Sequence, residues 1–171
     1  NILSTSGRIV GAIKSYQTAI SINPKYVDAY CNLGSSYRSL GQFDKAKKTF
    51  EKAIKANPKH NQSYNNLGIT LIKLDKLKDA LAAFKKAIQL APNNAMAHSN
   101  LGNTYKALDR FKEAIICYKK AIEIDPNYAE PYNNIGNAFK VLNFYEKAKK
   151  YLEKAIKINP NYANAYNSLG G

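Results

Sequence analysis

Residues 95–128 decide the fold, and they read AMAHSNLGNTYKALDRFKEAIICYKKAIEIDPNY. The same order of small, apolar and helix-ending residues returns every 34 residues on both sides of this stretch. Gly102, for example, corresponds to Gly68 in the preceding repeat and to Gly136 in the following one. A fixed period of this length indicates a repeat protein, in which each repeat is one unit of secondary structure.

The repeat frame covers the whole chain of 171 residues without a linker or a shift in composition. Residues 1–26 are a partial repeat, in which residues 1–6 are expected to supply the end of a first helix. The full repeats run over 27–60, 61–94, 95–128 and 129–162, and residues 163–171 begin another. We number the positions of a repeat from 1, so that Val27, Asn61, Ala95 and Ala129 all occupy position 1. The sequence therefore predicts one array and a single domain.

Each repeat is predicted to form two helices. The first carries an apolar stripe at helical spacing, which in the repeat from Val27 consists of Tyr30, Leu33, Tyr37 and Leu40. A second stripe follows Gly41 and ends at Pro58, because proline cannot continue a helix. At the position of Gly41, the later repeats have residues that are expected to turn the chain and to cap the next helix: Asp75, Asp109 and Asn143.

Glycine at position 8 lies inside the first helix, where it costs about 1 kcal/mol relative to alanine. A helix that accepts this loss in every repeat is expected to need close contact with its neighbour. Alanine at position 20 and a bulky residue at position 24, such as Ala114 and Tyr118, are expected to face the glycine.

This pattern resembles the tetratricopeptide repeat (TPR), whose signature combines Leu-Gly, an aromatic residue, two alanines and a proline over 34 residues. The resemblance covers nearly the whole chain. It implies an all-α, right-handed superhelical solenoid of stacked helix-turn-helix hairpins, with the first helices lining a concave face. Proteins of this kind act as scaffolds that bind peptides or other proteins.

Asparagine recurs on the face of the first helix that the apolar stripe leaves free. Position 6 is asparagine in every full repeat and position 9 in two of them: Asn32, Asn66, Asn100 and Asn134, with Asn103 and Asn137. A carboxamide offers donors and an acceptor, so such a ladder can pair with the backbone of an extended peptide whatever its side chains are. The simpler interpretation is that these are solvated polar residues in an asparagine-rich chain. The unbroken position-6 column favours a peptide-binding ladder.

This column is similar to the asparagine ladder in the superhelix of O-GlcNAc transferase and related bacterial TPR proteins. The similarity implies an alternative role, as the substrate-targeting arm of a larger glycosyltransferase. The lysines with which chaperone-tail-binding TPR proteins hold a carboxylate are absent from the corresponding positions.

The chain carries 26 Lys and Arg against 12 Asp and Glu, a net charge of +14. Most lysines belong to second helices, where interleaved glutamates indicate a solvated face. Four basic residues at positions 12 and 13 of the first helices are instead expected to line the groove and to favour an acidic ligand: Arg38, Lys73, Lys106 and Lys140. Nucleic acid is the rival ligand, since a basic chain is also typical of nucleic-acid-binding proteins.

Nothing in the sequence indicates catalysis, a cofactor or a metal. His98 falls on the core stripe and His60 in a turn, and Cys31 and Cys117 have no metal-ligand spacing. No apolar run reaches the length of a membrane span, and we expect a cytoplasmic scaffold that is not itself an enzyme. The permuted frame also predicts end-to-end stacking of chains, because residues 163–170 followed by residues 1–6 would complete a first helix.

Overall fold

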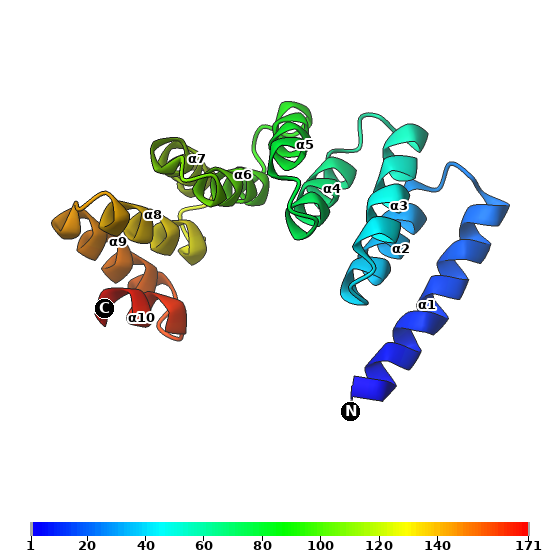
Figure 1. Cartoon of the computed structure of the whole chain (residues 1–171), viewed down its shortest axis with the longest axis horizontal. Coiled ribbons are helices and arrows are strands. Elements are labelled where there is room, and N and C mark those ends of the chain that lie inside the picture. The colour runs from blue at the N-terminus through cyan, green and yellow to red at the C-terminus, as the bar shows by residue number, and fades with distance from the viewer. Residues whose placement is uncertain (1, 171) are drawn as a thin grey trace. The chain divides into compact units, whose positions relative to one another are not determined.

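Ten α-helices follow one another in a computed structural model that describes the backbone of residues 2–170 and the side chains of residues 8–170 (Figure 1). Within these residues each full repeat contributes two helices and no strand occurs, so the fold is an all-α helical-repeat solenoid, as the sequence predicts. The helices are α1 (Ile2–Ile22), α2 (Val27–Ser39), α3 (Phe43–Ala56), α4 (Asn61–Lys73), α5 (Leu77–Leu90), α6 (Ala95–Ala107), α7 (Phe111–Ile124), α8 (Ala129–Val141), α9 (Tyr145–Ile158) and α10 (Ala163–Gly170).

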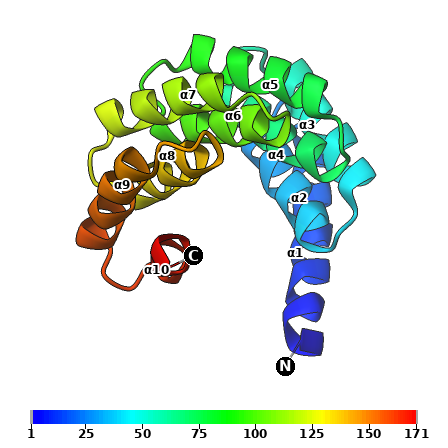
Figure 2. The ribbon, with the colours of Figure 1, turned by 60° about the vertical axis from the view of Figure 1, so that its left-hand side comes forward.

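The chain divides into two compact units, Asn1–Pro92 with α1 to α5 and Asn93–Gly171 with α6 to α10. In each unit the two helices of a repeat pack on each other, and the second helix packs on the first helix of the next repeat. Figure 2 shows this for the second unit, where α10 lies beside α8 and α9. A single array over residues 1–171 and the right hand of its superhelix stay predictions.

The glycine at position 8 lies against the bulky side chain at position 24, as predicted. A methyl group added at Gly102 would lie 2.6 Å from the ring of Tyr118, and one added at Gly136 would lie 2.6 Å from Leu152. These contacts are closer than carbon atoms tolerate, so only glycine lets the two helices of a repeat approach this far. The side chains at position 24 are almost completely buried in all four full repeats.

The turn between the two helices of a repeat is a Schellman motif. Gly41 has φ 71°, and its N–H donates to Arg38 O while the N–H of Gln42 donates to Tyr37 O. The prediction that Asp75, Asp109 and Asn143 turn the chain is confirmed, because each has φ between 56° and 62°.

The prediction that these three residues cap the next helix is wrong. The N-caps of α5, α7 and α9 are the residues that follow them, Lys76, Arg110 and Phe144, and none accepts a side-chain capping bond. The reason is geometric: a residue in the left-handed conformation closes the preceding helix, which moves the start of the next helix one residue on.

The expectation that residues 1–6 end a first helix is also wrong, because α1 is one continuous helix from Ile2 to Ile22. Gly7 has the frame position of Gly41 but is helical. Stacking of chains therefore stays a prediction, and it would require residues 2–6 to leave α1. Asn1 and the side chains of residues 2–7 lie outside the described residues.

Candidate functional site

The predicted ladder residues of the first unit lie on α2 and α4 in different surroundings. Asn32 is exposed, whereas Asn66 is only 9% exposed. The backbone carbonyl of Asn66 accepts a hydrogen bond from Thr70 Oγ1 at 2.8 Å, and Arg38 Nη1 lies 3.4 Å from the same oxygen. Arg38 Nη1 also lies 3.5 Å from the side-chain oxygen of Asn66. The guanidinium of one repeat thus holds the ladder residue of the next repeat in place.

In the second unit two of the ladder residues, Asn103 and Asn134, belong to a network centred on the carboxylate of Glu130. Asn134 Nδ2 donates to Asn103 Oδ1 at 3.0 Å and lies 3.5 Å from Glu130 Oε1, which also accepts from Asn103 Nδ2 at 3.2 Å. Tyr118 Oη, the phenol of the position-24 ring, donates to Asn103 Oδ1 at 2.7 Å. The structure therefore brings Asn103 and Asn134 together across two repeats.

This network fixes which atoms of the two carboxamides remain for a ligand. Both N–H groups of Asn134 point to partners within the protein, so Asn134 presents Oδ1 as an acceptor. Asn103 accepts two hydrogen bonds at Oδ1 and donates one, which makes it a positioning residue more than a contact residue. Asn100 and Asn137 are half-buried.

The tyrosines next to the network remain protonated. Burial, followed by the charge of Glu130, raises the pKa of Tyr118 and raises the pKa of Tyr128 to about 12. Tyr128 Oη donates to Glu130 Oε2 at 3.1 Å. Near neutral pH both phenols are therefore donors that keep the network in one arrangement.

The four predicted basic residues divide into two pairs. Arg38 contacts Asn66 as described above, and Lys140 Nζ donates to the backbone oxygen of Ser168 at 2.8 Å, so both hold the following first helix. Burial lowers the pKa of the Arg38 guanidinium, which stays charged at neutral pH. Lys73 is exposed and Lys106 is half-buried, and within residues 8–170 neither makes a hydrogen bond or an ion pair.

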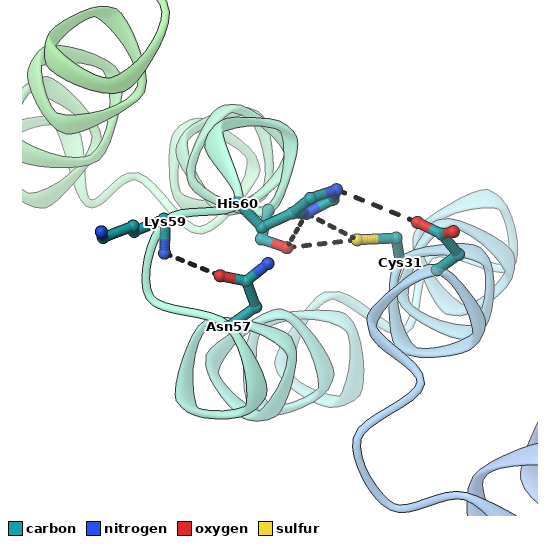
Figure 3. Close-up of polar contacts among 6 residues, drawn as sticks. Cys31, Asn57, Lys59 and His60 are labelled. Atoms are coloured by element: carbon teal, nitrogen blue, oxygen red, sulfur yellow. Dashed lines mark hydrogen bonds and ion pairs between the residues drawn. The ribbon is translucent and has the colours of Figure 1, made fainter.

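A polar cluster that the sequence analysis missed joins α2 to the start of α4 (Figure 3). Cys31 Sγ lies 3.2 Å from Ser63 Oγ and 3.8 Å from His60 Nδ1, and His60 Nε2 lies 3.9 Å from Asp28 Oδ1. Burial raises the pKa of the Cys31 thiol, and that side chain is only 5% exposed, so it is no thiolate nucleophile. The cluster ties two repeats together.

Two signals in the sequence could have located these residues. Asp28 and Cys31 are three residues apart on the first helix of one repeat and so share a face of that helix. His60 and Ser63 have the same spacing at the start of the first helix of the next repeat. Glu130 occupies position 2, on the same face as the ladder positions.

Among the described residues, no group of three or more His, Cys, Asp or Glu could hold a metal ion. No helix of the described part is both long and apolar enough to cross a membrane.

Comparison with known proteins gives one family and many similar folds. A family model described as the cilia and flagella-associated protein 70 C-terminal domain matches residues 2–170. The crystal structure of MamA is 28% identical, with a TM-score of 0.83 and coverage of 94% of both chains. YrrB, described as a TPR protein with an unusual peptide-binding site, is 28% identical with a TM-score of 0.79, covering 100% of this chain and 88% of YrrB.

A more distant structure supports the fold alone. TTC0263, a thermophilic TPR protein of Thermus thermophilus, is 20% identical with a TM-score of 0.79, and the match covers 98% of this chain and 92% of that chain. No curated protein matches the chain significantly.

Proposed function

Because the chain belongs to the tetratricopeptide-repeat family of the cilia and flagella-associated protein 70 C-terminal domain, we propose that it is a protein-interaction scaffold. Its ligand is an extended segment of a partner protein, held along the first helices by the position-6 asparagines. The peptide-binding site named for YrrB, which is 28% identical over the whole of this chain, supports this proposal.

The burial and the hydrogen-bond partners of the position-6 carboxamides support this function. Asn32 is exposed and Asn100 is half-buried, whereas Asn66 and Asn134 are 9% and 7% exposed. The N–H groups of Asn134 are directed to Asn103 and Glu130, which leaves its Oδ1 as the acceptor for a ligand. An acceptor fixed in this way fits a backbone N–H, which every residue of an extended peptide except proline supplies. The ladder therefore selects extended backbone and leaves side-chain choice to other parts of the surface.

An acidic segment is favoured by charge. The chain has a net charge of +14, and Lys73 and Lys106 have no partner within residues 8–170. Nucleic acid is the second candidate ligand, because the same positive charge would also attract its phosphates. The two differ in where the contacts fall, because a peptide in the ladder uses first helices whereas nucleic acid would use the lysines spread over the second helices.

The experiment that tests the proposal selects peptides from a random library on the whole chain and measures their affinity by calorimetry. The variant in which Asn66, Asn100 and Asn134 are all replaced by alanine should bind the selected peptides at least about tenfold more weakly, since each lost hydrogen bond contributes about 1 kcal/mol. The matched control is Asn93→Ala, which removes an exposed carboxamide in the turn after α5.

Circular dichroism of the triple variant separates binding from folding. We expect unchanged helicity, because alanine is the better helix former. Unchanged affinity in a folded triple variant would show that the ladder does not bind the peptide. Steep loss of binding with salt, together with selection of nucleic acid over peptide, would favour the second candidate.

A further inference from the structure

A cavity of about 530 Å³ opens in the second unit, where the turn before α8 meets the end of α9. Its walls include two carboxylates, Asp125 and Glu130, two phenol side chains, Tyr128 and Tyr162, and the apolar side chain of Ile158. We call it the Asp125–Glu130 pocket. Glu130 belongs both to this pocket and to the ladder network, because its Oε2 accepts from Tyr128 while its Oε1 accepts from Asn103.

Among the described side chains, those of residues 8–170, the two carboxylates of the pocket have no cationic partner. The ion pairs among the side chains of residues 8–170 involve Glu51, Asp28, Glu113 and Glu123, and neither Asp125 nor Glu130. Asp125 Oδ1 accepts the backbone N–H of Asn127 at 3.0 Å, and the donors to Glu130 are all neutral. The charge of both carboxylates is therefore available to a cationic side chain from outside the protein.

The first unit shows what occupies the equivalent place there. Position 2 is Asp28 and the last position of the same repeat is His60, whose Nε2 lies 3.9 Å from Asp28 Oδ1. In the second unit the corresponding residues are Glu130 and Tyr162. Burial raises the pKa of Tyr162, so its side chain is a neutral phenol. A histidine therefore faces the position-2 carboxylate in the first unit, and a tyrosine occupies that repeat position in the second.

We propose that the Asp125–Glu130 pocket binds a lysine or arginine side chain of the protein partner. The two carboxylates supply the charge, and the rings of Tyr128 and Tyr162 supply faces on which a cation is stabilised.

The pocket adds side-chain selectivity to a scaffold whose ladder reads only backbone. A ladder of asparagines alone gives a peptide little register, since every full repeat has an asparagine at position 6 and each can bind the backbone of any residue except proline. One basic residue seated against Glu130, within the network of Asn103 and Asn134, would fix the register of the segment.

The test uses the full chain labelled with ¹⁵N and two probes, Nα-acetyl-arginine amide and the neutral isostere Nα-acetyl-citrulline amide. We expect the arginine probe to shift the amide resonances of Tyr128, Asn159 and Tyr162 with saturation. We expect the citrulline probe to bind at least about tenfold more weakly, equal to about 1.4 kcal/mol. Equal responses to the two probes would overturn the proposal.

Substitutions at the carboxylates test whether the arginine probe binds in this pocket. Asp125→Asn alone, and together with Glu130→Gln, should weaken arginine binding by successive steps, whereas Asp28→Asn, the matched change in the first unit, should leave it unchanged. Asp125 is exposed, so the single variant keeps the test valid if the double variant fails to fold. Undiminished arginine binding in the folded variants would contradict the proposal. Asn100→Ala should retain the arginine response, so that failure of the pocket and failure of the ladder are separate results.

Discussion

Gly102 and Gly170 occupy the same position of their repeats but have different surroundings. An added methyl group at Gly102 would meet the fully buried ring of Tyr118, whereas one at Gly170 would meet nothing within 4 Å. Overpacking costs about 1–3 kcal/mol, and the helix propensity of alanine returns about 1 kcal/mol. We expect Gly102→Ala to lower the melting temperature measured by circular dichroism and Gly170→Ala to leave it unchanged or slightly higher. Equal effects would mean that the close contact does not determine the choice of glycine.

Tyr128 should make stability sensitive to alkaline pH. Its phenol ionises near 10 in the unfolded chain and at about 12 in the folded protein, because burial and the charge of Glu130 oppose its ionisation. The neutral phenol therefore stabilises the folded state below pH 10, and this contribution is lost as the pH rises from about 10 through about 12.

Urea unfolding at several pH values checks this. Tyr128→Phe should lose less stability across that range than the unaltered protein, while Tyr166→Phe, a change at a side chain that is 50% exposed, should follow the unaltered protein. Parallel pH profiles for all three proteins would contradict the assignment.

At this scale the sequence predicts packing better than polar contacts. Gly102 facing Tyr118 follows from the repeat pattern, because volume is conserved at fixed positions. The contacts of Glu130 with Asn103 and of His60 with Cys31 depend on side-chain conformations across neighbouring repeats, which residue types and spacing do not determine.

At the scale of elements, the Schellman turn predicts opposite effects of two substitutions. Gly41 and Asp75 both have positive φ, 71° and 56°, which glycine adopts without strain and other residues adopt at a cost of about 1–2 kcal/mol. Gly41→Ala should therefore destabilise the protein and Asp75→Gly should stabilise it, both measured by thermal unfolding. The same sign for the two changes would mean that backbone strain does not control the turn.

The helix bounds were largely predictable and one element was not. Pro58 and the turn residue Gly41 mark helix ends directly, so α2 and α3 follow from the sequence. The long α1 was not predictable in this way, because the repeat pattern assigns a turn to Gly7 from its position alone. The helix continues through Gly7, so the repeat position alone does not determine where a turn forms.

For the whole molecule, the positions of the lysines that matter show whether an acidic peptide binds at a defined site or is attracted only by the net positive charge. Lys73→Gln with Lys106→Gln should weaken binding of an acidic peptide and flatten its salt dependence more than Lys52→Gln with Lys119→Gln, an equal loss of charge from exposed second-helix positions. Calorimetry at two salt concentrations measures both effects. Equal losses from the two pairs would show that only the net charge of +14 matters.

Whether the asparagine ladder binds the peptide backbone is best measured by changing the peptide and leaving the protein as it is. A library-selected peptide is compared by calorimetry with analogues in which single backbone amides are replaced by esters, which removes one N–H donor and leaves every side chain in place. We expect esters at the residues facing position 6 to weaken binding about tenfold, while alanine replacement of the peptide side chains has little effect except at the basic residue and at the acidic residues that face Lys73 and Lys106. Full affinity of all ester analogues, with binding lost through side-chain replacement, would show that the asparagine ladder does not bind the peptide backbone.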